Sequence, residues 1–236
     1  MGDEGEKGRW EVIIAIDIET IPNVDAIPFL PEPKISKTLK DPVKIAAAQI
    51  EAKAEQIADM ALSPLTGRVC CFAIVGVEEG APKEMTETIL AAQDDEELPL
   101  IQGIMRVLGA EETRIVTWNG IGFDLPFIYK RAMILGVDPA NFVAPPLHAW
   151  TKRYDTARHY DLMKIWSGWA SGADGFVKLD TVAAMVLKER KTEIDVTTFA
   201  ALLATEEGRK KIAEYCLQDT RLTWRLWEKM NGFLFS

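Results

Sequence analysis

The sequence predicts an α/β protein in which a mixed central β-sheet is flanked by α-helices. Two apolar runs, 11–17 (EVIIAID) and 68–77 (RVCCFAIVGV), have the length and the β-branched content of buried strands. Two helix-like segments between 94 and 135 enclose a third such run, and the chain is mostly helical in pattern from residue 179 onward. Strands that alternate with helices in this way indicate one sheet covered by helices.

The first expected strand, 11–17, ends in an acidic residue and is followed by a proline-rich stretch, 21–41, that we interpret as a long loop. An Ala-rich helix is expected over 42–62, because Asp41 suits the N-cap and Pro42 suits the first helical position. The fold class therefore includes a helical insertion, at about 41–63, after the first strand.

The later elements follow from the same kinds of signal. A helix over 94–108 has an acidic first turn and Gly109 at its end. Residues 137–157 and 167–175 read as irregular, because proline or small residues interrupt any periodicity. We expect further strands at 84–89, 114–118 and 158–162, and further helices at 124–135, 179–188, 198–204 and 206–230.

Composition limits the classes of protein that fit. The 236 residues, 48% of them hydrophobic, suit a single domain over 11–236 behind a flexible leader, 1–10. No apolar run is long enough to span a membrane, the start has no signal-peptide character, and the three cysteines lack zinc-site spacing. These features predict a reducing, cytoplasmic setting. The net charge of −9 argues against holding duplex nucleic acid by bulk electrostatics, yet permits an enzyme that grips a few nucleotides through metal ions.

Three short motifs carry acids in places where chemistry is plausible. Asp17 and Glu19 are two residues apart at the end of a strand, so both side chains point to one face, where paired carboxylates suit Mg²⁺ or Mn²⁺. Asp124 closes the segment 119–124 (NGIGFD) at a helix start, where it is equally explained as an N-cap. Tyr215 and Asp219 lie one turn apart on the last helix, beside positions that look like core.

In this order, the motifs DIET, NGxxFD and YxxxD resemble the three exonuclease motifs of the DEDDy branch of the DnaQ-like, ribonuclease H-like superfamily. The segment 116–131 (VTWNGIGFDLPFIYKR) is similar to the proofreading domain of family-B DNA polymerases. The stretch from Asp41 to Arg68 is similar to the helical insertion of predicted stand-alone exonucleases related to that domain. The sister branch carries a histidine five residues before the last Asp, where this chain has Glu214.

The resemblance implies a ribonuclease H-like fold and 3′→5′ hydrolysis of single-stranded DNA with two divalent ions, Mg²⁺ or Mn²⁺. It implies that Asp17 bridges the two ions, that Glu19 and Asp219 hold the ion that carries the attacking water, and that Asp124 acts through the second ion. Tyr215 would orient the water, since a phenol with a pKa near 10 is a poor base at neutral pH. Ile18, Thr20, Asn119 and Phe123 are the expected substrate contacts, although core packing also explains Phe123.

Two alternatives remain at this point. The same five residues would serve an RNA-trimming exoribonuclease, and the fold could act as a non-catalytic nucleic-acid-binding module. Asp161 is expected to be structural or to support the site, and the basic residues Lys164 and 188–191 to guide a nucleic-acid backbone. A usual Gly-Leu-Pro-Gly-Lys turn of the family is replaced by 186–191 (VLKERK), which puts the substrate groove there in doubt. Replication or repair proteins are the expected partners, with any proofreading performed in trans.

Overall fold

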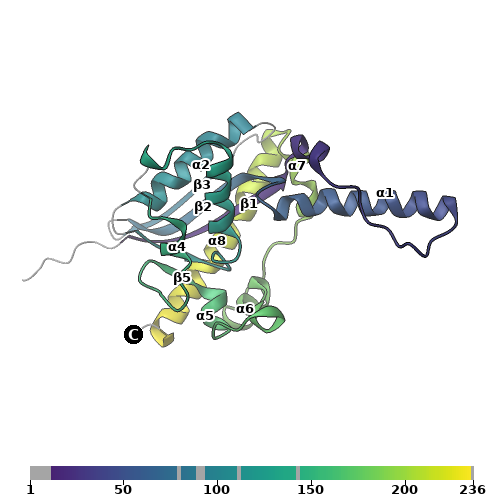
Figure 1. Cartoon of the computed structure of the whole chain (residues 1–236). Coiled ribbons are helices and arrows are strands. Elements are labelled where there is room, and N and C mark those ends of the chain that lie inside the picture. The colour runs from purple at the N-terminus through teal and green to yellow at the C-terminus, as the bar shows by residue number, and fades with distance from the viewer. Residues whose placement is uncertain (1–11, 79–80, 89–93, 111–112, 142–143, 235–236) are drawn as a thin grey trace, which may run out of the picture.

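The structure is a computed structural model that describes residues 12–78, 81–88, 94–110, 113–141 and 144–234. The expected leader, 1–10, lies outside the described residues. A twisted sheet lies between helices on its two faces, and one long helix projects from this body (Figure 1).

Five strands form one mixed sheet in the order β3-β2-β1-β4-β5. β1 pairs antiparallel with β2 and parallel with β4, while β3 extends the antiparallel side and β5 the parallel side. The predicted α/β class with a mixed sheet is therefore confirmed. The strands are β1 (Val12–Pro22), β2 (Gly67–Glu78), β3 (Ala81–Thr88), β4 (Thr113–Thr117) and β5 (His159–Asp161).

Most helices occupy nearly the predicted ranges, but two short ones were not predicted: Leu147–Trp150, in a segment expected to be irregular, and Leu162–Trp166. Short 3₁₀ turns at Val24–Phe29 (η1), Met60–Leu62 (η2), Pro139–Asn141 (η3), Gly172–Gly175 (η4) and Val196–Thr198 (η5) interrupt the irregular segments. The α-helices are α1 (Pro42–Asp59), α2 (Asp94–Gly109), α3 (Asp124–Ile134), α4 (Leu147–Trp150), α5 (Leu162–Trp166), α6 (Leu179–Val186), α7 (Phe199–Leu202) and α8 (Glu206–Leu234).

The predicted end of the first strand at Asp17 is wrong, because β1 continues to Pro22. Antiparallel pairing with β2 extends to Pro22 opposite Gly67, whereas the parallel pairing with β4 stops at Ala15 opposite Val116. The apolar pattern that marked the strand ends at the first acid, while the backbone pairing does not. Asp17 and Glu19 therefore lie on the part of β1 that extends beyond its pairing with β4.

Apolar side chains alternate along β1 and build a core on each face of the sheet. Ile14, Ile16 and Ile18 pack with buried side chains of α2 and α3. Ala15 packs with residues of α6 and α8 on the other face, where Ile21 joins Cys70, Cys71 and the α7 and α8 side chains. Asp17 and Glu19 belong to this second face, which α8 covers (Figure 1).

A buried ion pair fixes α3 against the sheet. Arg131 on α3 donates through Nη2 to Glu97 on α2 at 2.5 Å, and Glu97 Oε1 also accepts the Val69 backbone N–H of β2 at 2.9 Å. Both charged side chains have 1% or less of their surface exposed. Since a buried charge must be paired and hydrogen-bonded, this contact defines how α3, and hence its first residue Asp124, sits on β2.

The predicted helical insertion is present as α1, which projects from the body (Figure 1). Its N-cap is Asp41, whose side chain accepts the Val43 N–H at 2.9 Å, as the sequence predicted. No residue of α1 is buried. The base of the projection is fixed by η2, where Met60 is buried and the Ala61 carbonyl accepts the Thr20 hydroxyl at 2.7 Å.

No helix among the described residues is long and apolar enough to cross a membrane.

Candidate active site

Two acids of β1 form the centre of the candidate site. Asp17 lies opposite Ala73 of β2 and Glu19 opposite Cys71, and the register shifts between Glu19 and Thr20. The extra residue at this position is Cys70 on β2, so β2 bulges opposite the end of the acid pair, and bulges are common next to active sites. Asp17 and Glu19 share one face, as their spacing predicted, and both are partly exposed.

The turn between β4 and α3 brings Asp124 toward β1. Asn119 adopts a left-handed conformation with φ of 71°, and its carbonyl accepts the N–H groups of Gly122 and Phe123. A side chain on Gly120 would lie 2.3 Å from the Thr117 hydroxyl, so the tight path requires glycine there. Asp124 then opens α3 with 3% of its surface exposed.

Asp161, at the end of β5, holds this turn in place. Its carboxylate accepts the backbone N–H groups of Asn119 at 3.2 Å and of Ile121 at 2.9 Å, and it also caps α5 through the Lys164 N–H at 3.1 Å. Only 1% of its surface is exposed. The structure therefore gives Asp161 the structural role that was one of the two expectations for it.

A chain of hydrogen bonds from Trp150 to Gly120 also holds the turn between β4 and α3. The Trp150 carbonyl contacts His159 Nδ1 at 2.7 Å, His159 Nε2 contacts the Thr117 hydroxyl at 2.7 Å, and that hydroxyl oxygen accepts the Gly120 N–H at 2.9 Å. Burial lowers the pKa of His159, so a neutral ring completes this chain. Hydrogen bonds from groups on α4, β4 and β5 thus fix the conformation of the turn.

α8 crosses the face of β1 that carries the acids and contributes Tyr215 and Asp219 to the site. Tyr215 and Asp219 are 8% and 4% exposed, and the Tyr215 ring packs edge-on against Phe199 of α7 at 5.7 Å between centroids. Between them Cys216 places its sulfur 3.7 Å from the Asp17 carbonyl oxygen and 3.9 Å from Asp17 Oδ2. One face of α8 therefore supplies three side chains to the site, as the helical spacing of Tyr215 and Asp219 predicted.

The pKa values of all four carboxyl groups are raised. Burial raises the pKa of Asp17 well above its usual range, and the charges of Asp124, Glu19 and Asp219 raise it further. The pKa of Glu19 is also raised well above normal, by burial and then by Asp219. Burial raises the pKa of Asp124 to about 7 and that of Asp219 to about 6. The cluster is consequently unstable as four carboxylates unless positive charge joins it.

Lys191 supplies one such charge, and the sequence did not single it out as a site residue. Its ammonium forms an ion pair with Asp219 Oδ2 and lies 4.6 Å from the centre of the Tyr215 ring. Burial opposes the charge on Lys191, but the Asp219 carboxylate raises its pKa above the usual value. The only sequence signal was the basic run 188–191, which was read as a guide for a nucleic-acid backbone.

Asp180 of α6 fixes the segment that carries Lys191. Its Oδ1 accepts the Lys191 backbone N–H at 2.9 Å, and its Oδ2 pairs with the Arg190 guanidinium at 3.1 Å. Lys191, Asp180 and Tyr215 line a groove of about 610 Å³ next to the carboxylates. The segment 186–191 thus places its last residue, Lys191, at the edge of the carboxylate cluster.

The donor set fits divalent cations. Asp17, Glu19 and Cys216 each offer one ligand atom, and these three atoms lie within 4.8 Å of one another. Asp124 Oδ1 and Asp219 Oδ1 are buried and are two of the few side-chain atoms in the described residues with no hydrogen-bond partner. Buried carboxylate oxygens without donors are suited to hard ions such as Mg²⁺ or Mn²⁺. The site accordingly has the chemistry of a divalent-metal centre.

The four expected substrate contacts have varied surroundings. Ile18 is 4% exposed and packs in the core that faces α2 and α3, and Phe123 packs against Phe127 at 5.5 Å between ring centroids. The Thr20 hydroxyl donates to the Ala61 carbonyl, which ties β1 to the base of α1. Asn119 lies in the turn before Asp124 and is partly exposed. All four lie beside the acids in sequence, and their role toward a substrate stays a prediction.

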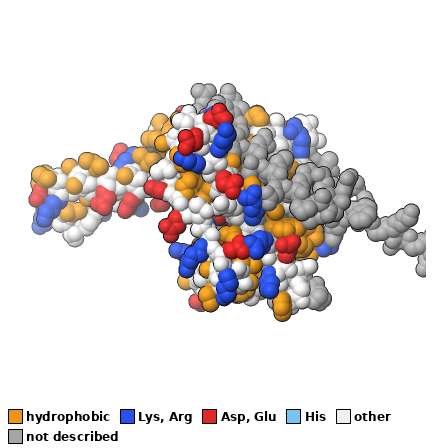
Figure 2. Space-filling model, turned by 180° about the vertical axis from the view of Figure 1, so that it is seen from behind, with side chains coloured by type: hydrophobic (Ala, Val, Ile, Leu, Met, Phe, Trp, Pro, Cys, Tyr) orange, Lys and Arg blue, Asp and Glu red, His pale blue; other side chains and the backbone are white. Residues whose placement is uncertain are grey.

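Charges on the surface are mixed rather than segregated. Figure 2 shows lysine and arginine side chains interspersed with acidic ones on the face opposite to the view of Figure 1. Several exposed pairs are close, among them Lys210 with Glu206 at 2.6 Å and Lys211 with Glu207 at 2.9 Å on α8. This pattern agrees with the expectation that bulk electrostatics do not drive binding of duplex nucleic acid.

The chain is similar in sequence to several DNA polymerases. The chain is 30% identical over 169 residues to DNA polymerase 1 of Aeropyrum pernix, which covers 68% of this chain and 16% of that polymerase. It is 30% identical over 121 residues to a DNA polymerase of Thermococcus aggregans and 31% identical over 118 residues to DNA polymerase 1 of Saccharolobus solfataricus. Each of these covers 48% of this chain, and the chain matches less than a fifth of any of the three polymerases.

Among solved structures, the family B DNA polymerase of Pyrobaculum calidifontis superimposes with a TM-score of 0.60 at 19% sequence identity. The match covers 98% of this chain and 26% of the polymerase, and it shows the common fold, which confirms the predicted ribonuclease H-like class. Residues 63–234 match the sequence profile of a family described as predicted 3′-5′ exonucleases related to the exonuclease domain of PolB. Because this match covers most of the chain, the chain belongs to this PolB-related exonuclease family.

Proposed function

We propose that the protein is a 3′→5′ exonuclease that hydrolyses phosphodiester bonds at the 3′ end of single-stranded DNA and uses two divalent ions, Mg²⁺ or Mn²⁺. The observation that carries the proposal is that Asp17, Glu19, Asp124 and Asp219 form one cluster. The charges of the other three acids raise the pKa of Asp17, and the pKa values of those three are raised as well. Two unpartnered carboxylate oxygens in that cluster support a role as metal ligands.

The four acids would hold the ions, with Asp17 central because it is next to the other three. Bound ions of this kind activate water as a nucleophile and stabilise the charge of the leaving oxygen. Tyr215 keeps its proton at neutral pH, because burial and the Asp219 charge raise its pKa to about 12. Its hydroxyl would therefore donate or accept a hydrogen bond to orient the attacking water rather than remove a proton.

Lys191 would act on the substrate side of the reaction. Its ammonium is held against Asp219 and the Tyr215 ring, at the edge of the carboxylate cluster. A fixed positive charge at that point would stabilise the negative charge that grows on the phosphate. We assign Ile18, Thr20, Asn119 and Phe123 as contacts of the terminal nucleotide, because they flank Asp17, Glu19 and Asp124 in the chain.

DNA is favoured as the substrate because the matched relatives are DNA polymerases, and replication or repair is the corresponding setting. An exoribonuclease would need contacts to the 2′-hydroxyl, so matched RNA and DNA substrates separate the two activities. A non-catalytic binding module is the third candidate, and the complete set of four acids with Tyr215 argues against it.

The test uses single-stranded DNA and RNA of one sequence, each labelled at the 5′ end, with Mg²⁺ or Mn²⁺. The expected result is stepwise shortening of the DNA from its 3′ end, faster than that of the RNA, and its loss in the Asp17→Asn variant. A Lys210→Gln variant, which removes an exposed charge on α8, should cleave at the rate of the unaltered protein. Failure of both polymers to shorten in either metal would exclude both exonuclease activities and leave the binding module.

A further inference from the structure

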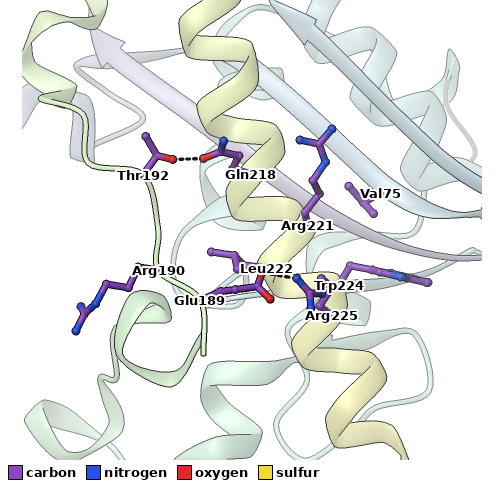
Figure 3. Close-up of a pocket in the computed structure, with 9 residues that line it drawn as sticks. All are labelled: Val75, Glu189, Arg190, Thr192, Gln218, Arg221, Leu222, Trp224 and Arg225. Carbon is purple, nitrogen blue, oxygen red and sulfur yellow. Dashed lines mark hydrogen bonds and ion pairs between the residues drawn. The ribbon is translucent and has the colours of Figure 1, made fainter. Parts of the chain in front are cut away.

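A second cavity, of about 430 Å³, lies between the segment 189–192 and α8. Figure 3 shows the segment running alongside the helix, with Glu189, Thr192, Gln218 and Leu222 in the space between them, while the Arg190 side chain points away from the helix. None of the four acids assigned as metal ligands lines this cavity, and neither does Tyr215 or Lys191. Its volume is in the range of small-molecule binding sites.

The lining of the cavity is positively charged although the protein is acidic overall. Arg190, Arg221 and Arg225 line it together with a single acid, Glu189. Arg225 pairs with Glu189 across the cavity through Nη1. A guanidinium has five N–H donors in a planar fork, so Arg225 can hold a phosphate with its other nitrogen atoms while it keeps one contact with Glu189.

The acids that pair with the other two arginines are outside the cavity. Arg190 contacts Asp180 at 3.1 Å, and Arg221 contacts Glu214 at 2.9 Å, and neither acid is part of the lining. These contacts orient the two guanidinium groups without placing negative charge in the space. The residues that line the cavity therefore include three arginines and one glutamate, although the Arg190 side chain points away from α8.

Another part of the wall is apolar. Val75 of β2 and Leu222 and Trp224 of α8 line it, and the Trp224 ring is backed by Trp227 at 4.9 Å between centroids. Thr192 and Gln218 contribute polar groups and are hydrogen-bonded to each other, as Figure 3 shows. Arginines opposite an apolar and aromatic wall match a ligand that has a phosphate at one end and a flat ring at the other.

We propose that this cavity binds a nucleotide, with its phosphate against Arg225 and its base against the Leu222 and Trp224 wall. The cavity adjoins the carboxylate site through two pairs of consecutive residues, because Thr192 follows Lys191 and Gln218 precedes Asp219. The nucleotide is either a free mononucleotide, such as the proposed reaction would release, or a nucleotide of the bound strand upstream of its 3′ end. Binding itself does not require cleavage.

The test measures binding of deoxyadenosine monophosphate, inorganic phosphate and a short oligothymidine to the full chain by calorimetry, without divalent ions so that nothing is cleaved. The Arg225→Gln variant should weaken nucleotide binding by about tenfold, the usual size for loss of a charged hydrogen bond. Glu189→Gln should instead tighten binding, because it removes the one carboxylate that faces the ligand. A purely structural ion pair predicts no such gain.

Lys210→Gln is the matched control, since it removes one exposed positive charge from the same helix and should leave binding unchanged. If oligothymidine competes with the mononucleotide and its binding is weakened by the same Arg225→Gln variant, the cavity lies on the path of the strand. If it does not compete, the ligand is a free mononucleotide. Absence of saturable mononucleotide binding, equal binding of inorganic phosphate, or Glu189→Gln without a gain would each overturn the proposal, whether or not the protein cleaves DNA.

Discussion

At the scale of single residues, the buried carboxylates of the site repel one another, and a bound cation reduces this repulsion. Asp124 and Asp219 are 3% and 4% exposed, and burial raises their pKa values to about 7 and about 6. Both acids raise the pKa of Asp17, and the cation Lys191 contacts Asp219. Such a cluster costs stability in the folded protein, and that cost is offset when a cation binds.

The pH dependence of stability follows from these two groups. Each carboxyl binds its proton more tightly in the folded protein than in the unfolded chain, where its pKa is near 3.8. The free energy of unfolding of the metal-free protein should therefore fall as the pH rises from about 4 to about 7, by on the order of 2–4 kcal/mol. Urea unfolding across this range measures it, and Asp124→Asn should flatten the slope. A stability that increases with pH would contradict the assignment.

The Lys191 ammonium lies beside Asp219, where a metal ion would otherwise place positive charge. Replacing Lys191 should therefore strengthen metal binding and weaken cleavage. In Lys191→Met the Asp219 carboxylate loses its ion pair, and Mn²⁺ should bind more tightly in the absence of nucleic acid. The cleavage rate at saturating metal should nevertheless fall by at least about tenfold, since a charge near the reacting phosphate is lost. Calorimetry with Mn²⁺ and a single-turnover assay separate the two effects. Lys188→Met, on the exposed side of the same segment, is the control.

At the scale of elements, the turn 119–123 depends on a neighbouring strand for its shape. Asp161 of β5 accepts the N–H groups of Asn119, Ile121 and Lys164. Asp161→Ala would leave the first two without their acceptor and should destabilise the protein by roughly 2–4 kcal/mol. It should also slow cleavage more than the lost stability explains, because Asp124 follows this turn. Asp155→Ala removes a surface cap of the Ala157 N–H and should cost about 1 kcal/mol or less.

Secondary structure was largely predictable because its signals are local. Asp41 and Pro42 fixed the start of α1, and the apolar runs located β1, β2 and β4. The end of β1 was missed because its last residues are held by pairing with β2, which no local pattern reveals. Lys191 was missed for the same reason: its position depends on Asp180, eleven residues earlier on another element. Contacts that link distant segments leave little trace in one sequence.

At the scale of the whole molecule, mixed surface charge sets how strongly a nucleic acid is attracted. The chain carries a net charge of −9, and its basic residues are interspersed with acids (Figure 2). Among the described residues, only a few cations, such as Lys191 and Arg190, lie near the proposed site. Binding of a single strand should thus release few counterions, with a slope of log affinity against log salt of about −2.

That slope can be measured with the Asp124→Asn variant, which stops cleavage, at a fixed Mn²⁺ concentration and increasing KCl. Adding Lys191→Met should make the slope shallower by about 0.7, the contribution of one phosphate contact on a single strand. A slope of about −5 or steeper would mean that the strand follows a basic surface beyond the described site. Lys210→Gln should leave the slope unchanged, since Lys210 is paired with Glu206 on α8.

The projecting helix α1 has an evolutionary consequence. Because none of its side chains is buried, substitutions along its length should change stability by no more than about 0.5 kcal/mol each. Its base, in contrast, is anchored by Met60 and by the bond from Thr20 to Ala61, one residue from Glu19. The helix can therefore diversify under selection for new neighbours while β1 stays under constraint. Lineages of this family would be expected to differ most along this helix and least where it joins β1.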